Sequence, residues 1–174
     1  MKKSLCAALC AMLILVLACP SASAAYGWGD LLDSLMGSSS KEEEVRYSIG
    51  ETVETEDVKV ILLDVKESRG GSFFTPESGN VFLICTFEIQ NCTKEEMNIS
   101  SLLCFEAYCD DYNVDLSLSA ECSVNASTLD GNIAPGKKMK GIIGYEVPVE
   151  WKTLEIHFTP EVWFGDTFVF YCEK

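Results

Sequence analysis

The most regular pattern in the sequence is the alternation of apolar and polar residues over residues 132–148. A Pro135-Gly136 turn opens this segment, and one side of it then carries Met139, Gly141, Ile143, Tyr145 and Val147. The other side carries Lys138, Lys140, Ile142, Gly144 and Glu146. A repeat of two residues is typical of a half-buried antiparallel strand, and Pro148 ends it because proline lacks an N–H. We therefore predict a central strand of an all-β sandwich here.

Similar strand patterns recur along the chain with turn residues between them. They cover residues 47–53, 57–67, 80–90, 99–108, 114–118, 154–159 and 167–172. Within 99–108 we expect Leu103, Phe105 and Ala107 to face the core. About seven or eight strands with no convincing helix predict an immunoglobulin-like antiparallel β-sandwich over residues 45–174.

The first residues have the pattern of an export leader. Lys2 and Lys3 form a short basic segment of the kind found in bacterial leaders, an apolar run covers residues 5–17, and Ala22-Ser23-Ala24 is a cleavage signal. The apolar run is too short to span a bilayer. We predict a signal peptide over residues 1–24 and a flexible tether over 25–44, followed by one domain.

A second cleavage scheme is open at Cys19. The sequence Val16-Leu17-Ala18-Cys19 resembles the lipobox of bacterial lipoproteins, in which the cysteine is lipidated and becomes the first residue. Both schemes predict a secreted or cell-surface protein. Any membrane association is expected to depend on a lipid anchor at Cys19.

The charge of the chain narrows the range of partners. The formal net charge is −14, and loss of two lysines and no acid with the leader takes it to −16. Phosphate backbones and anionic lipids repel such a chain, so we expect no nucleic-acid binding. The simplest consequence of the negative charge is solubility. A more specific consequence would be affinity for cations or basic partners.

Six of the nine cysteines remain after the leader: Cys85, Cys92, Cys104, Cys109, Cys122 and Cys172. An even number in an exported chain predicts up to three disulfides, with the pairing open. The alternative is that some are buried thiols, since cysteine packs like a small apolar residue. Between Cys104 and Cys109 we expect a structural bridge or free thiols rather than a redox pair. Zinc binding is disfavoured because no C-x-x-C is present.

Catalytic patterns are weak. His157, the only histidine, alternates with core residues and should point outward, and no Gly-x-Ser-x-Gly motif accompanies it. The spacing of Gly131, Gly136 and Lys137 imitates a phosphate loop, but it leads into a strand and Lys138 stands where Ser or Thr is needed. We expect no enzymatic activity and no cofactor.

Two further sets of residues are candidate contacts. Asp111, Asn113 and Asp115 have the spacing of a calcium loop, with Glu121 near its end, but Leu116 stands where glycine is needed. A solvated turn is the alternative. A contact surface could be formed by loop aromatics, namely Phe73, Phe74, Trp163 and Phe164, although such residues often close the ends of a sandwich core. Of Phe73 and Phe74 we expect one to be buried.

Several of these segments together resemble a known family. Asn80-Val81-Phe82-Leu83 through Gln90-Asn91, Phe105-Glu106-Ala107, Ile133 to Pro148 and Leu154 to Phe158 are similar to the telokin-like extracellular domain. The resemblance covers residues 50–174. It implies an immunoglobulin-like sandwich of unknown function in secreted proteins and lipoproteins of Gram-positive bacteria, similar in fold to a mycobacterial immunoprotective secreted antigen. It transfers no functional residue.

Two functions remain as hypotheses. The first is a non-enzymatic extracellular or cell-surface interaction module that acts through loops or an edge strand on a protein or a cell-envelope component. The second is an accessory protein of the envelope that binds a small ligand or cation, such as a glycan or calcium.

Overall fold

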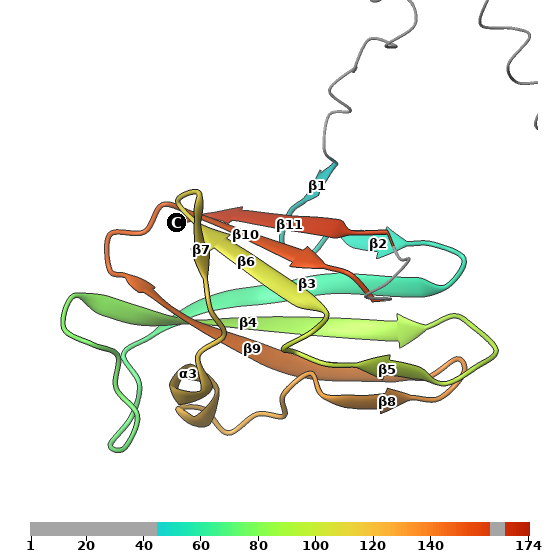
Figure 1. Cartoon of the computed structure of the whole chain (residues 1–174), viewed down its shortest axis with the longest axis horizontal. Helices are drawn as coiled ribbons and strands as arrows, with labels where there is room; N and C mark the ends of the chain where they lie inside the picture. Colours follow the sequence, from blue (N-terminus) through green and yellow to red (C-terminus); the bar gives the residue numbers. More distant parts are fainter. Residues whose placement is uncertain (1–44, 161–165) are drawn as a thin grey trace, which may run out of the picture. The chain divides into compact units, whose positions relative to one another are not determined.

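Two β-sheets face each other, and Figure 1 shows them as two layers. The computed structural model describes residues 45–160 and 166–174, all of which belong to the second of two units, Glu43–Lys174. The predicted signal peptide, the tether and Cys19 lie outside the described residues. Within the described ranges, no helix is long and apolar enough to cross a bilayer.

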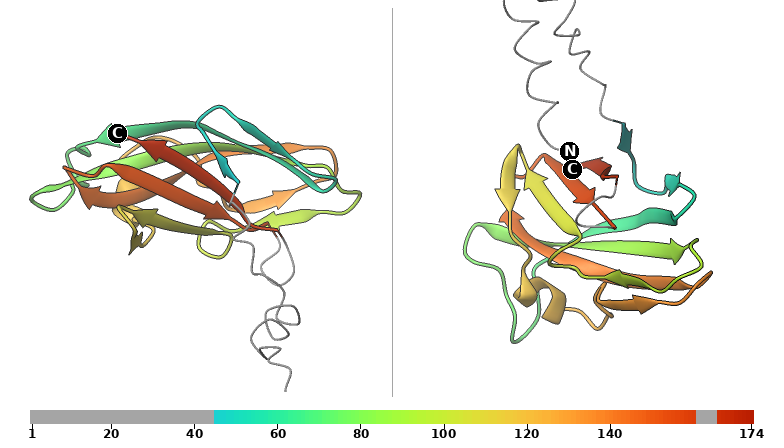
Figure 2. Two further views of the ribbon diagram at one scale, coloured as in Figure 1. Left: turned by 90° about the horizontal axis from the view of Figure 1, so that it is seen from above. Right: turned by 45° about the vertical axis from the view of Figure 1, so that its right-hand side comes forward.

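The first sheet has the order β1-β11-β10-β6-β7. Its strands are β1 (Arg46–Tyr47), β11 (Phe168–Glu173), β10 (Thr153–Phe158), β6 (Phe105–Cys109) and β7 (Tyr112–Val114). The second sheet, β2-β3-β4-β9, consists of β2 (Thr52–Glu54), β3 (Val58–Ser68), β4 (Asn80–Asn91) and β9 (Lys138–Pro148). A separate pair joins β5 (Met97–Ile99) to β8 (Gly131–Ile133). Figure 2 shows the two main layers from two further sides.

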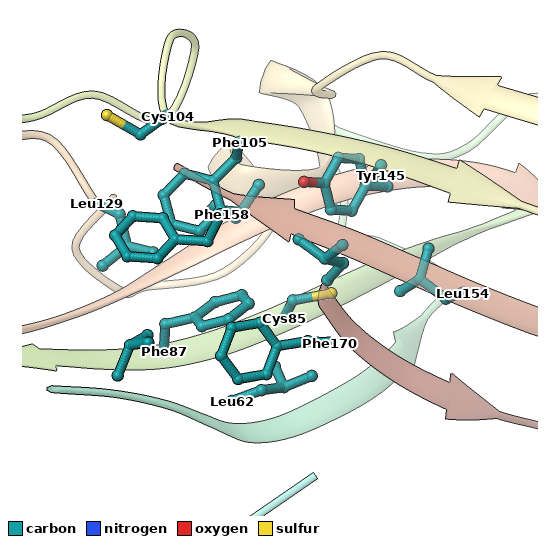
Figure 3. Packing of buried hydrophobic residues seen from close by; sticks show 14 of the residues in the cluster. Leu62, Cys85, Phe87, Cys104, Phe105, Leu129, Tyr145, Leu154, Phe158 and Phe170 are labelled. Atoms are coloured by element: carbon teal, nitrogen blue, oxygen red, sulfur yellow. The ribbon is translucent and has the colours of Figure 1, made fainter. Parts of the chain in front are cut away.

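Aromatic side chains from both sheets meet in the interior, as Figure 3 shows. The centre of the Phe87 ring on β4 lies 5.4 Å from the centre of the Phe105 ring and 5.3 Å from that of Phe170. Phe105 and Phe170 belong to the opposite sheet. Phe105 lies 4.7 Å from Phe158, and all four rings are buried. Tilted and edge-on rings at these distances attract each other beyond the gain from burial. The β-sandwich predicted from the sequence is confirmed.

The strand predicted within residues 132–148 is β9. Ile143, Tyr145 and Val147 are buried, so the predicted inward face is confirmed. The central position is wrong, because β9 pairs with β4 on one side and, among the described residues, meets only single bridges from Leu116 and Thr128 on the other. Alternation reports which face of a strand is buried and not how many strands flank it. Pro148 is tolerated because it lies at an edge.

A single helical turn, α3 (Leu118–Cys122), lies against β9 where no helix was predicted. The hydroxyl of Ser117 accepts the N–H of Ala120 at 3.2 Å and caps this turn. Ala120 then completes a small apolar cluster on the outer face of the second sheet with Phe82, Ile84 and Ile142. The predicted strand over 114–118 is therefore wrong beyond Val114, because capping by Ser117 and cover for the sheet favour a turn.

The predicted first strand, residues 47–53, is divided between the two sheets. β1 pairs in parallel with β11, whereas β2 pairs antiparallel with β3. Gly50 lies between them with a φ of 84°, in the left-handed region that favours glycine. The chain thus changes sheets at a residue that the sequence pattern treats as part of a strand.

The predicted strand over 99–108 is also two strands, β5 and β6. The N–H groups of Leu103 and Cys104 both donate to the carbonyl of Ser100, which closes a tight turn. Leu103 is 65% exposed as a result, so the prediction that it faces the core is wrong. Phe105 and Ala107 are buried as expected.

We predict that Gly144 is required for the close approach of α3 to β9. A Cβ at this position would lie 2.6 Å from the Cβ of Ala120 and 2.9 Å from the backbone nitrogen of Glu121. Gly144→Ala should lower the free energy of unfolding by about 1–3 kcal/mol, because the helical turn must move. Urea unfolding measures the loss.

The matched control is Gly71→Ala. A Cβ there would find no atom nearer than the Ser123 carbonyl at 4.0 Å. Its effect should stay within about 0.5 kcal/mol. Equal stabilities of the two variants would contradict the contact between α3 and β9.

Candidate functional site

A row of polar and aromatic side chains crosses the outer face of the first sheet. The register pairs Glu155 on β10 with Tyr108 on β6 and with Tyr171 on β11. Directly opposed residues of antiparallel strands point to the same face. The neighbours Leu154 and Ile156 are buried in the core, so the row faces outward.

Glu155 contacts a nitrogen-containing side chain on each side. Its Oε2 lies 3.0 Å from the guanidinium of Arg46 on β1, and its Oε1 lies 2.7 Å from Nε2 of His157. The guanidinium carbon lies 5.3 Å from the centre of the Tyr171 ring, and the imidazole lies 5.3 Å from the centre of the Tyr108 ring. The contact between Arg46 and Tyr171 is a cation–π contact, whereas the rings of His157 and Tyr108 form a tilted aromatic pair.

The hairpin between β6 and β7 positions one end of this row. Asp110 and Asp111 have φ angles of 49° and 68°, as a two-residue hairpin with both central residues in the left-handed region requires. Oδ1 of Asp110 accepts the backbone N–H groups of Lys152 at 3.0 Å and Thr153 at 2.9 Å. The pKa of Asp110 is lowered, and the backbone hydrogen bond from Thr153 is the largest cause. The start of β10 is thereby fixed beside the hairpin.

These side chains enclose a half-open cleft of about 430 Å³. Its lining consists of Arg46, Tyr108, Asp111, Thr153, Glu155, His157 and Tyr171. Small-ligand sites typically measure about 300–1,000 Å³. The hydroxyl of Tyr171 donates to Glu173 at 3.1 Å, and desolvation, followed by this carboxylate, raises the pKa of Tyr171. The cleft thus offers aromatic surface together with hydrogen-bond donors and acceptors.

The outward position of His157 matches the sequence prediction, since it lies on the outer face between buried Ile156 and Phe158. None of the residues Arg46, Tyr108, Glu155 and Tyr171 was among the candidates identified from the sequence. Alternation placed Glu155 and His157 on the outer side of their strand. Only the pairing of β10 with both β6 and β11 brings the tyrosines beside them.

The loop aromatics are placed differently from the prediction. Phe73 is 92% and Phe74 is 39% exposed, so the expectation that one of them is buried is wrong. Gly70 has a φ of 74°, and the N–H of Gly71 donates to the carbonyl of Phe74. This turn keeps both rings out of the core. Trp163 and Phe164 lie outside the described residues.

The four calcium candidates fall on separate elements. Asp111 is in the hairpin turn, Asn113 is on β7, Asp115 is exposed beyond it, and Glu121 is on α3. The amide of Asn113 donates to the carbonyl of Ala107 at 3.5 Å. Among the described residues, no three acidic, histidine or cysteine side chains are grouped to hold a metal.

All six predicted disulfide cysteines are free thiols in the described residues, which differs from the expectation of up to three bridges. Cys104 precedes β6 and Cys109 ends it, so their Cα atoms are about 16 Å apart, far beyond disulfide reach. Cys109 and Cys172 both pair with Leu154, one from each side, which separates them by about 10 Å.

The buried thiols are held in their protonated form. Burial, followed by the nearby Cys172 thiol, raises the pKa of Cys85 well above its usual value. Burial also raises the pKa of Cys109 and of Cys172 to about 11 and raises that of Cys104. Figure 3 shows Cys85 within the aromatic cluster beside Phe170. These four side chains behave as apolar packing, which was the alternative left open by the sequence.

Glu121 is an acid in an apolar setting. It is 6% exposed, and its Oε1 has no hydrogen-bond partner among the described residues. Burial raises the pKa of this carboxyl, the nearby Asp130 acts in the same direction, and a bond from the N–H of Gly144 opposes them. An unpaired buried acceptor costs stability. The residue considered for calcium is instead a buried acid on α3 that lowers stability.

The fold and the cleft define a β-sandwich domain with a polar, aromatic depression on one outer face. Over residues 47–169 the chain matches the family described as Domain of unknown function (DUF4352). The chain therefore belongs to the DUF4352 family. The resemblance drawn from the strand motifs of the sequence is confirmed.

Three solved structures are similar to this chain. A Bacillus subtilis protein described as a "putative lipoprotein" has 16% identity and a TM-score of 0.58; the match covers 70% of this chain and 38% of that one. A β-sandwich protein of Clostridium difficile 630 has 20% identity and a TM-score of 0.50, with 75% and 97% covered. The secreted protein MPT63 of Mycobacterium tuberculosis has 12% identity and a TM-score of 0.48, with 76% and 99% covered. For the first two structures, the likeness at these identities concerns the fold alone. No match was found among curated proteins.

We predict two fast-reacting thiols in a native protein that consists of residues 25–174. Cys92 and Cys122 are exposed, whereas the other four are buried. A chromogenic disulfide reagent should titrate these two in native protein and all six after denaturation without reductant. The double variant Cys92→Ser/Cys122→Ser should lose the fast phase. Fewer than six thiols after denaturation would show that disulfides form.

We predict that Glu121 makes the protein less stable as pH rises. The folded state favours the protonated carboxyl of Glu121. Between the reference pKa of 4.5 and the raised pKa in the folded state, the folded protein therefore binds more protons than the unfolded protein. Stability therefore falls as pH increases through that window. Glu121→Gln should be more stable than wild type at neutral pH by about 1 kcal/mol or more and nearly equal below the window.

Thermal unfolding across this pH range measures the difference. Glu56→Gln is the control, because Glu56 is exposed on the surface. The control should show the wild-type pH profile. A Glu121→Gln profile parallel to wild type would show that the carboxyl is not strained.

Proposed function

We propose that this chain is a non-enzymatic interaction module that works outside the cytoplasm and binds its partner through the outer face of the first sheet. The observation that carries the proposal is the cleft over Tyr108, Glu155 and Tyr171. Its side chains come from strands β1, β6, β10 and β11 and from the hairpin next to β7, so a rigid sheet sets their positions. This surface differs from the loops or edge strand that the sequence suggested.

The state of Glu155 and His157 supports binding rather than reaction. A carboxylate and an imidazole in one cleft are candidates for general acid–base chemistry. Here both oxygens of Glu155 are engaged, one by Arg46 at 3.0 Å and one by His157 at 2.7 Å. Each group thus helps to hold the others in place, and the carboxylate and guanidinium keep further acceptor and donor positions. Such a network suits a preorganised contact surface.

The predicted location outside the cytoplasm is supported by two observations. The first is the leader pattern of residues 1–24, which fits a signal peptide or, with Cys19, a lipoprotein. The second is the similarity in fold to a Bacillus subtilis protein described as a "putative lipoprotein". A formal net charge of −14 for the whole chain suits a soluble or surface-tethered module.

We predict that the two tyrosines are required for binding to the cell envelope. Fluorescently labelled mature chain should bind saturably to isolated envelopes of the source organism, and unlabelled protein should compete. Tyr108→Ala/Tyr171→Ala should weaken binding at least about tenfold, equivalent to about 1.4 kcal/mol, because it removes the aromatic surface of the cleft. A sedimentation assay measures the bound fraction.

The matched control is Tyr112→Ala. Tyr112 is 78% exposed on the same hairpin but does not line the cleft. It should bind like wild type, and circular dichroism should show all variants folded. Equal binding by the double variant and wild type would place the contact on another surface.

A further inference from the structure

The two tyrosines of the cleft form a spaced pair of aromatic surfaces. Tyr108 and Tyr171 both oppose Glu155 in register, so one strand lies between them. Two strand spacings place their backbones about 10 Å apart. Both side chains are half-buried and fixed against His157 and Arg46, respectively. Because both rings are already ordered, binding of a ligand costs little side-chain entropy.

The cleft is lined by one guanidinium and two carboxylates, and one of these carboxylates is paired with the guanidinium. Arg46 is paired with Glu155. An anionic ligand would be repelled by the carboxylates of Glu155 and Asp111, and a cationic ligand would be repelled by the guanidinium. Asp111, on the exposed rim, has no ion-pair partner among the described residues. A neutral ligand escapes both repulsions and can still accept from and donate to these groups.

The polar groups around the rings are both donors and acceptors. Arg46 donates, the carboxylates of Glu155 and Asp111 accept, and the hydroxyls of Tyr108 and Thr153 do both. A ligand that matches them needs hydroxyl groups at its edges and apolar C–H faces for the rings. Sugars have this combination. The cleft volume of about 430 Å³ lies within the range of small-ligand sites and is on the order of one or two sugar rings.

The opposite outer face provides a comparison within the same molecule. A depression of about 610 Å³ there is lined by residues of β3, β4 and β9, including Asp64, Lys66 and Lys140, and by Ala126 and Ser127 of a loop. None of its lining side chains is aromatic. Lys66 is paired with Asp64 at 2.7 Å, and this surface lacks the apolar planes that a sugar face requires. The aromatic and polar combination distinguishes the cleft on the first sheet.

We infer that the cleft on the first sheet binds a neutral glycan, with sugar rings against Tyr108 and Tyr171 and hydroxyl groups on Glu155, Arg46 and Asp111. This inference rests on the proposed function and names the chemistry of its partner. Aromatic side chains supply the contact area, and the charged groups fix the orientation of the hydroxyls. A basic peptide is the competing occupant, because it could use Asp111 and the rings.

The test is a nuclear magnetic resonance titration of ¹⁵N-labelled mature chain, residues 25–174, with three probes. Two are neutral oligosaccharides, cellotetraose and the tetramer of N-acetylglucosamine, and the third is tetralysine. We expect saturable shifts around Tyr108, Glu155 and Tyr171 with at least one neutral oligosaccharide. Tyr108→Ala should weaken this binding at least about tenfold, and Tyr112→Ala should leave it unchanged.

The outcomes separate this inference from the proposed function. If tetralysine alone shifts the cleft residues, or if no probe does while envelope binding still needs both tyrosines, the glycan inference fails and the interaction surface stands. If envelope binding is independent of the tyrosines, the proposed surface fails as well. Because the titration follows wild-type resonances, it decides the question even when a tyrosine variant does not fold.

Discussion

The contact of Phe87 with Phe105 and Phe170 joins the two sheets, and the remaining architecture depends on it. Phe87 is the aromatic side chain of β4 that meets rings from two strands of the opposite sheet. Closely packed interiors tolerate little change in volume, so this contact fixes the separation and register of the layers. With both inner faces saturated by apolar side chains, the outer faces are free to carry polar groups.

The β9 edge of the second sheet is covered by a helical turn instead of by another full strand. β9 lacks a full neighbour on one side, and α3 covers its outer face through Ala120 and Gly144. This cover buries Glu121, whose unpaired oxygen and raised pKa oppose folding. The free energy lost by burying one acid is small compared with the free energy gained from the apolar area that the helical turn covers. The arrangement is therefore stable overall.

Functional chemistry in this protein depends on strand pairing more than on any single residue. Glu155 alone is an ordinary surface acid, and Tyr108 and Tyr171 are ordinary strand residues. Once β10 lies between β6 and β11, the three form one row, and β1 brings Arg46 to the same carboxylate. A rigid sheet holds most of this surface in place, and the β6–β7 hairpin adds Asp111 at one end. The buried thiols, by contrast, contribute only packing to this scaffold.

The sequence by itself determined the fold class, the inward side chains of the long strands such as Ile143 and Tyr145, and the outward position of His157, because an extended chain with one buried face must alternate. It did not determine that β9 is an edge strand, that Gly50 and the Ser100 turn each divide a strand, or that Leu103 and Phe74 are exposed. Nor did it place Arg46, Tyr108, Glu155 and Tyr171 together. Those features depend on which strands pair and where the chain turns, and contacts between residues distant in sequence decide both.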